Sequence, residues 1–127
     1  QLQLEVSARI VSYGMGSGPN TSLLTQPSRA IRQALSKVDL DISDLTLFEL
    51  NEAFAAVGLA ATEDLGISDE IVNVNGGAVA LGHPIGMSGN RLALTLVNEL
   101  RRRGGGFGAA ALCGGGGQGD ALILEVA

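Results

Sequence analysis

The sequence has 127 residues, of which 46% are hydrophobic and 17% charged, and its formal net charge is −5. This length suits one domain with a hydrophobic core and is too short for two ordinary domains, while the composition excludes a disordered chain. The negative charge argues against a nucleic-acid partner, because contacts with phosphate groups need a basic surface.

The first half of the chain predicts a strand, a helix and a second strand. The chain starts at Gln1 and enters an apolar–polar alternation at once, so we expect a piece of a longer polypeptide, with a one-sided strand over residues 2–10. Glycine, proline and asparagine predict a loop at residues 13–20. Helical spacing of apolar residues then predicts a helix at 27–38, and an apolar run predicts a strand at 45–50.

The second half continues the alternation of helix and strand. Alanine and leucine over residues 53–65 predict a helix that stops at Gly66. A short buried strand at 71–74 leads into a glycine-rich loop at 75–86. The remaining predicted elements are a long amphipathic helix through residues 92–100 that ends at Arg101-Arg102-Arg103, and two apolar strands at 107–113 and 121–126.

The order β-α-β-α-β-α-β-β predicts an α/β domain with a five-stranded, mostly parallel mixed sheet and helices on both faces. The last two strands are joined too briefly for a parallel crossover, so we expect them to pair antiparallel. Function in such sheets gathers at the carboxyl ends of strands. Three loops have this position, at residues 51–54, 75–86 and 113–119.

His83 is the only histidine, and it lies in a glycine frame just before a predicted helix. The positive end of a helix favours a neutral imidazole, which can accept a proton from a thiol or donate a hydrogen bond to an oxyanion. A lone histidine can also simply cap or pack. The glycines and the position at a strand end favour the functional interpretation.

Cys113, the only cysteine, ends a strand and is followed by four glycines. A single cysteine excludes an internal disulfide and is typical of proteins in a reducing compartment, so we expect a cytoplasmic protein. A buried cysteine can act as a small hydrophobe, but packing alone does not require the glycines, whose N–H groups can bind an anion or an oxyanion. A dinucleotide site is rejected, because a strand follows the loop where that fingerprint needs a helix.

Asn51 follows the strand at 45–50 directly and precedes a helix. Asparagine is a good N-cap, and taken alone that interpretation is the simpler one. The alternative is an amide that orients a water or a carbonyl in a site.

Together the loops resemble the successive signatures of the thiolase family, in the family's order and over nearly the whole chain. The asparagine motif, the Gly-His-Pro loop and the Cys-glycine loop are specific in combination, and they correspond to the C-terminal of the family's two similar domains. The motifs are Asn51-Glu52-Ala53-Phe54-Ala55-Ala56, Asn73-Val74-Asn75-Gly76-Gly77-Ala78, Gly82-His83-Pro84 and Cys113-Gly114-Gly115-Gly116-Gly117-Gln118-Gly119.

The resemblance implies acyl transfer between coenzyme A thioesters, with the nucleophilic cysteine on an N-terminal domain that this chain lacks. Cys113 would be the second cysteine, the general acid/base at the α-carbon of the substrate. His83 would activate the nucleophile and contribute to an oxyanion hole, where Asn51 would hold a catalytic water. The N–H of Gly115 would donate to the thioester oxygen of the acyl-enzyme.

The resemblance also implies substrate contacts and partners. Met15 corresponds to a pocket-lining methionine, and Ala53 and Phe54 would lie beside the pantetheine tunnel. The segment at 18–27 is longer than in the usual thiolase pattern. We expect no metal and no cofactor, acyl-CoA substrates, the N-terminal domain and a homo-oligomer as partners, and no membrane partner, because no apolar run is long enough to span one.

Two alternatives stay open at this point. In the first, Cys113 is itself the nucleophile of a self-contained dyad with His83. In the second, the chain is a non-catalytic assembly module, because it carries no second cysteine.

Overall fold

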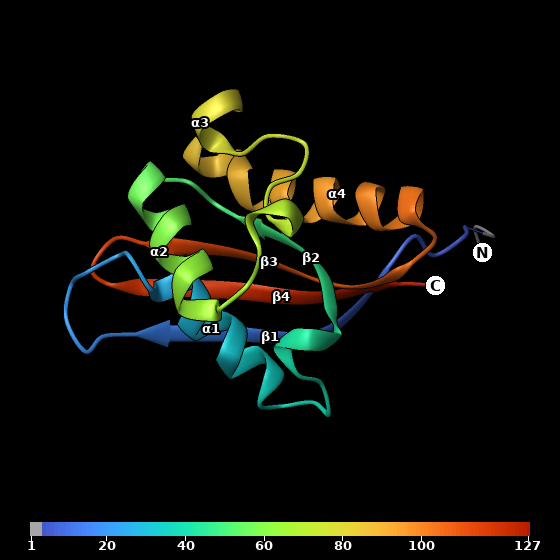
Figure 1. Cartoon of the computed structure of the whole chain (residues 1–127), viewed down its shortest axis with the longest axis horizontal. Helices are drawn as coiled ribbons and strands as arrows, with labels where there is room; N and C mark the ends of the chain where they lie inside the picture. Colours follow the sequence, from blue (N-terminus) through green and yellow to red (C-terminus); the bar gives the residue numbers. More distant parts are fainter. Residues whose placement is uncertain (1–3) are drawn as a thin grey trace.

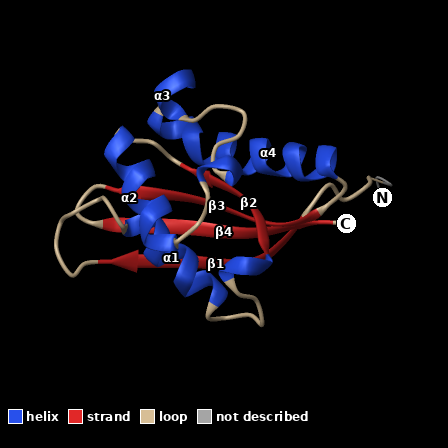
Figure 2. Cartoon of the chain, viewed as in Figure 1, coloured by secondary structure: helices blue, strands red, loops and turns tan. Residues whose placement is uncertain are grey.

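A computed structural model describes residues 4–127 as an α/β domain with one mixed sheet between layers of helices (Figure 1; Figure 2). The strands are β1 (Arg9–Ser17), β2 (Leu45–Leu50), β3 (Gly106–Gly114) and β4 (Gln118–Val126). The helices are α1 (Gln26–Leu35), α2 (Ala55–Leu65), α3 (Ala78–Leu81) and α4 (Ile85–Arg103), with single 3₁₀ turns at Ile42–Asp44 and Asp69–Ile71.

In the described part of the chain the sheet has four strands, in the order β1-β4-β3-β2. The antiparallel pairing of β3 with β4 is confirmed, and β2 runs parallel to β3. β1 is antiparallel to β4, so the expectation of a mostly parallel sheet is wrong. Helices on both faces are confirmed, and none of those described is long and apolar enough to cross a membrane.

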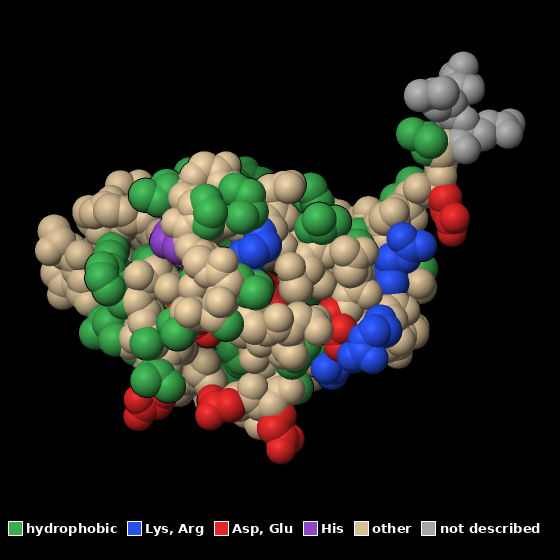
Figure 3. Space-filling view, turned by 90° about the horizontal axis from the view of Figure 1, so that it is seen from above, with side chains coloured by type: hydrophobic (Ala, Val, Ile, Leu, Met, Phe, Trp, Pro, Cys, Tyr) green, Lys and Arg blue, Asp and Glu red, His purple; other side chains and the backbone are tan. Residues whose placement is uncertain are grey.

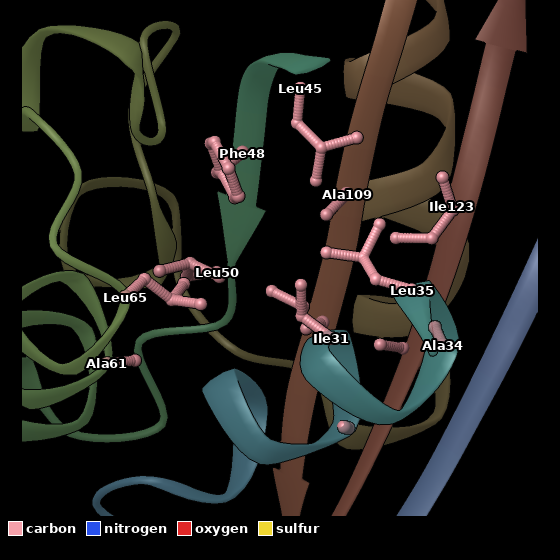
Figure 4. Close-up of a cluster of buried hydrophobic side chains, with 13 residues drawn as sticks. Ile31, Ala34, Leu35, Leu45, Phe48, Leu50, Ala61, Leu65, Ala109 and Ile123 are labelled. Atoms are coloured by element: carbon pink, nitrogen blue, oxygen red, sulfur yellow. The ribbon is translucent and has the colours of Figure 1, made fainter. Parts of the chain in front are cut away.

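Each face of the sheet carries its own hydrophobic core. Ala109 and Ala111 of β3 face the core beneath α1 and α2, where Ile31 and Phe48 are fully buried (Figure 4). Ala110, on the opposite face, packs in the core under α4. The small side chains of β3 allow helices to approach both faces of the same strand closely.

The first strand lies later in the chain than the sequence predicts. Residues 2 and 3 fall outside the described part, and β1 continues to Ser17 through most of the predicted loop at 13–20. The glycines that indicated a loop serve close packing here: a Cβ on Gly14 would lie 2.0 Å from the Ala30 carbonyl oxygen of α1.

We expect Gly14→Ala to destabilise the domain by about 1–3 kcal/mol, because the added methyl must push α1 away from β1. Gly16→Ala is the matched control on the same strand, since a Cβ there would meet nothing within 4 Å. Urea denaturation of both variants measures the difference. Equal midpoints would contradict the close approach of helix and strand.

The predicted strand at 71–74 is wrong, so the sheet formed by residues 4–127 has four strands in place of the expected five. Only Val72 forms a parallel bridge, with Phe48 of β2. Asn73 then turns into the left-handed region with φ 47°, and its side chain binds the backbone of Leu50 in place of a strand: Leu50 N donates to Oδ1 and Nδ2 donates to Leu50 O, both at 2.8 Å. This side chain ends the pairing along the edge of β2.

Candidate active site

The carboxyl ends of β2 and β3 meet at one edge of the sheet, because these two strands are parallel. Asn51, the residue after β2, continues the pairing by donating its N–H to the Ala111 carbonyl at 2.9 Å. Cys113 lies two residues further along β3. The same edge therefore carries two of the predicted site residues.

Asn51 and His83 are brought together by a side-chain contact. Asn51 is fully buried, and its Nδ2 lies 3.3 Å from Nε2 of His83. The N-cap interpretation of Asn51 is wrong, because α2 begins at Ala55 and Phe54 occupies the N-cap position. The amide is directed to the imidazole instead.

Ser88 fixes the orientation of the His83 ring, and the sequence analysis missed it. Its Oγ lies 2.6 Å from His83 Nδ1 and donates its own proton to the Pro84 carbonyl at 3.1 Å. This arrangement is satisfied when Nδ1 carries the ring proton and donates it to Oγ. Nε2 is then the unprotonated nitrogen, which accepts from Asn51 and can act as a base.

Cys113 is buried at the end of β3, and burial raises the pKa of its thiol. A raised pKa keeps the thiol protonated at neutral pH. No hydrogen bond joins Cys113 to His83 or Asn51 within residues 4–127. The self-contained Cys–His pair is therefore not formed in this structure.

The glycine loop after Cys113 is a tight turn between β3 and β4, with Gly115 exposed at its tip. Gln118 Nε2 donates to the Gly115 carbonyl at 2.9 Å, and Gly116 has φ 85°. The loop leads into β4, so the rejection of a dinucleotide fingerprint is confirmed. The long segment at 18–27 packs on this turn, because Gly18 N donates to the Gly117 carbonyl.

The three predicted substrate contacts lie at different places. Met15 lies on β1 and lines an apolar cavity of about 350 Å³ together with Leu92 and Leu122. Ala53 is half-buried and Phe54 is exposed between β2 and α2. No described residue joins Met15 to the Asn51–His83 contact by a hydrogen bond.

A buried ion pair lies below this edge, and the sequence analysis did not identify it. Glu49, two residues before Asn51, is 2% exposed, and its Oε2 lies 3.9 Å from Arg91 Nη1 of α4. Burial raises the pKa of Glu49 to about 7, although the charge of Arg91 opposes the shift. A glutamate inside an otherwise apolar strand was the available sequence signal.

Apolar side chains surround the His83 segment on the outer face. Val79 and Leu81 of α3 are 70% and 58% exposed, and Ile85 of α4 is 85% exposed. Figure 3 shows hydrophobic side chains gathered on this upper face of the molecule. Within residues 4–127, no cluster of His, Cys, Asp or Glu could hold a metal ion.

The family profile described as "Thiolase, C-terminal domain" matches residues 4–126. The chain belongs to the thiolase family. This thiolase domain is 53% identical over 125 residues to a probable acetyl-CoA acetyltransferase of Mycobacterium leprae, a match that covers 98% of this chain and 32% of that protein. It is 46% identical over 126 residues to acetyl-CoA acetyltransferase 2 of Arabidopsis thaliana, covering 99% of this chain and 31% of the relative.

Solved thiolase structures share the fold. The crystal structure of human mitochondrial 3-ketoacyl-CoA thiolase superposes with a TM-score of 0.91 at 45% identity, over 95% of this domain and 31% of that chain. The acetyl-CoA acetyltransferase of Bacillus anthracis gives a TM-score of 0.90 at 48% identity, over 94% of this domain and 30% of that chain. The thiolase domain thus spans about a third of the length of the curated relatives it matches.

Proposed function

We propose that this domain is the C-terminal half of an acyltransferase that forms and cleaves 3-ketoacyl thioesters of coenzyme A. The observation that carries the proposal is the hydrogen-bonded series Asn51–His83–Ser88, which leaves an unprotonated Nε2 at the edge of the sheet where β3 brings Cys113. Family membership and relatives named for acetyl-CoA acetyltransferase and 3-ketoacyl-CoA thiolase support the same reaction class.

In this proposal His83 acts on a cysteine of another domain. Its Nε2 accepts the proton of that thiol, and the resulting thiolate attacks the carbonyl carbon of an acyl thioester. The bond from that carbon to the sulfur of CoA breaks, CoA leaves with the proton that His83 returns, and a covalent acyl-enzyme remains. Asn51, beside Nε2, holds a water that shares the oxyanion site with the histidine. The N–H of Gly115 donates to the thioester oxygen of the acyl-enzyme, because the exposed turn allows a ligand to reach it.

Cys113 has a separate role in the proposed reaction. It moves a proton at the α-carbon of the second acyl-CoA, a task for which a thiol with an adjustable pKa is suited. Its protonated form can protonate the carbanion released when a 3-ketoacyl-CoA is cleaved. Met15, Ala53 and Phe54 are proposed to contact the acyl-CoA.

An N-terminal thiolase domain is the proposed partner. The exposed apolar side chains of Val79, Leu81 and Ile85 next to His83 would be covered by it, since contiguous apolar patches are typical of interfaces. The share of about a third of the relatives' length agrees with a further domain. A cytoplasmic location, a role in fatty acid metabolism, homo-oligomerisation and independence from metals and cofactors remain predictions.

The proposal is tested by comparing the 127-residue chain with the complete thiolase, in which this chain follows an N-terminal thiolase domain. We expect the complete thiolase to cleave acetoacetyl-CoA in the presence of CoA, and the isolated chain to have no activity. Absorbance of the acetoacetyl-CoA enolate measures the rate. Acylation of Cys113 in the isolated chain, detected by intact mass, would instead support the self-contained pair.

A further inference from the structure

Glu52 connects the asparagine motif to the segment that carries His83. We propose that Glu52 is a positioning residue, which holds the His83 segment against Asn51 through its two carboxylate oxygens. The inference deepens the proposed function and rests on it for the role of His83, whereas the placement of the imidazole can be measured without activity.

The Glu52 carboxylate receives two hydrogen bonds from the segment of residues 73–83, which follows α2 in the chain. Oε1 accepts from Asn73 Nδ2 at 2.9 Å, and Oε2 accepts from the backbone N–H of Val79 at 2.8 Å. Gly77 leaves the space that the carboxylate occupies, because a Cβ on Gly77 would lie 2.4 Å from it. Glycine at position 77 therefore allows the Glu52 carboxylate to lie where it does.

These contacts complete a ring of attachments between β2 and the segment of residues 73–83. Asn73 binds Leu50 at the start of the segment, Glu52 binds Val79 in α3, and His83 binds Asn51 at its end. Helix α3 has only four residues, too few to be stable alone. The position of His83, two residues beyond α3, therefore depends on these anchors.

The two groups that bind the Glu52 side chain require a carboxylate at position 52. Both Asn73 Nδ2 and Val79 N are donors, and an ionised carboxylate offers an acceptor oxygen to each. A glutamine has one acceptor oxygen, and its NH₂ group would face a donor. Glu52→Gln thus breaks one of the two bonds with almost no change in side-chain volume.

The first test reads the imidazole directly in the 127-residue chain, where His83 is the only histidine. Long-range ¹H–¹⁵N spectra of the labelled chain should show one neutral tautomer with the proton on Nδ1. In Glu52→Gln we expect a mixture of tautomers, because a displaced His83 loses its fixed contacts with both Asn51 and Ser88. Glu63→Gln, on the exposed face of α2, is the matched control and should leave the spectrum unchanged.

The second test measures steady-state kinetics in the complete thiolase. We expect Glu52→Gln to lower kcat by about 10- to 100-fold, the size of effect that a displaced catalytic group produces, with KM for CoA changed less than about twofold. If the unmodified complete thiolase has no activity, the proposed function fails and the tautomer measurement still decides the role of Glu52.

Gly77→Ala is the second variant, because it displaces the carboxylate and leaves Glu52 itself intact. Its φ is in the ordinary region, and the three atoms nearest to the added methyl all belong to the Glu52 carboxylate. We expect the same mixture of tautomers as in Glu52→Gln, and this variant decides the question if Glu52→Gln does not fold. A single Nδ1-protonated tautomer and an unchanged kcat in Gly77→Ala would overturn the proposal.

Discussion

Replacing Cys113 by alanine in the complete thiolase is expected to lower kcat for acetoacetyl-CoA cleavage about a thousandfold, within the range for loss of a general acid or base. Cleavage of the carbon–carbon bond leaves a carbanion that must be protonated. Burial raises the pKa of the Cys113 thiol, so the group carries its proton at neutral pH. Alanine has no proton to give, and the measurement is the initial rate of acetoacetyl-CoA loss.

The first acyl transfer should survive this substitution, because exchange between thioester and thiol breaks no carbon–hydrogen bond. Intact mass after incubation with acetyl-CoA should therefore show a full acetyl label in Cys113→Ala, on the N-terminal domain. His83→Ala is the complementary variant, which should slow the labelling itself, since Nε2 is the proposed base. Unimpaired cleavage by Cys113→Ala, or an acetyl group on Cys113, would contradict the assigned role.

Sequence patterns predicted the edge of the sheet where the candidate site lies. A strand ending at residue 50 and a parallel neighbour ending near Cys113 require their carboxyl ends to meet, and the pairing of β2 with β3 agrees. The pattern could not choose between the two interpretations of Asn51. The choice depends on where α2 begins, and that start lies four residues after Asn51.

The pattern of apolar residues could not show where a side chain takes the hydrogen bonds that a neighbouring strand would otherwise make. The apolar run at 71–74 has the composition of a strand, but the Asn73 side chain takes the hydrogen bonds that a strand would make with Leu50. Gly14 carries a similar ambiguity, because a glycine can indicate a loop or a close contact with a helix. Only the packing of α1 on β1 distinguishes these possibilities.

The sequence patterns also missed side-chain contacts that join different secondary-structure elements. Ser88 lies in α4 and reaches back five residues to His83, and Glu49 and Arg91 come from a strand and a helix that are distant in sequence. A one-sided strand would place Glu49 in solvent, whereas β2 is covered by α4 on the face that Glu49 occupies. The burial of this pair has a measurable consequence.

Arg91→Met is expected to lower the free energy of unfolding of the domain by about 1–2 kcal/mol at pH 8, because the Glu49 carboxyl, one pH unit above its pKa of about 7, must then take up a proton. Among the described residues, Arg91 is the one charge that lowers the pKa of Glu49, whereas Glu52 and Glu99 raise it. Without Arg91, the Glu49 carboxyl at 2% exposure has no other cation beside it among the described residues, so it keeps its proton at pH 8 and the ionisation that Arg91 favours is lost. Urea denaturation followed by circular dichroism measures the loss.

The loss should depend on pH, and its sign follows from the pKa of Glu49. The folded-state value of about 7 lies above the ordinary 4.5, so folding is favoured by the protonated form and loses this contribution as pH rises from 4.5 through 7. At pH 5, Glu49 is neutral with or without Arg91, and Arg91→Met should cost little. Arg29→Met, at an exposed position of α1, should give a small effect at both pH values.

Glu49→Gln is the third variant of this test. Glutamine cannot ionise, so the pH dependence that Glu49 gives to the free energy of unfolding should disappear. Its free energy of unfolding should stay level between pH 5 and pH 8, whereas that of the unmodified chain should fall across this range. The pair Glu49→Leu/Arg91→Leu should be close to the unmodified chain in stability, since well-packed apolar groups often replace a buried ion pair without loss. An equal loss for Arg91→Met at pH 5 and pH 8 would show that Arg91 stabilises the domain by packing alone.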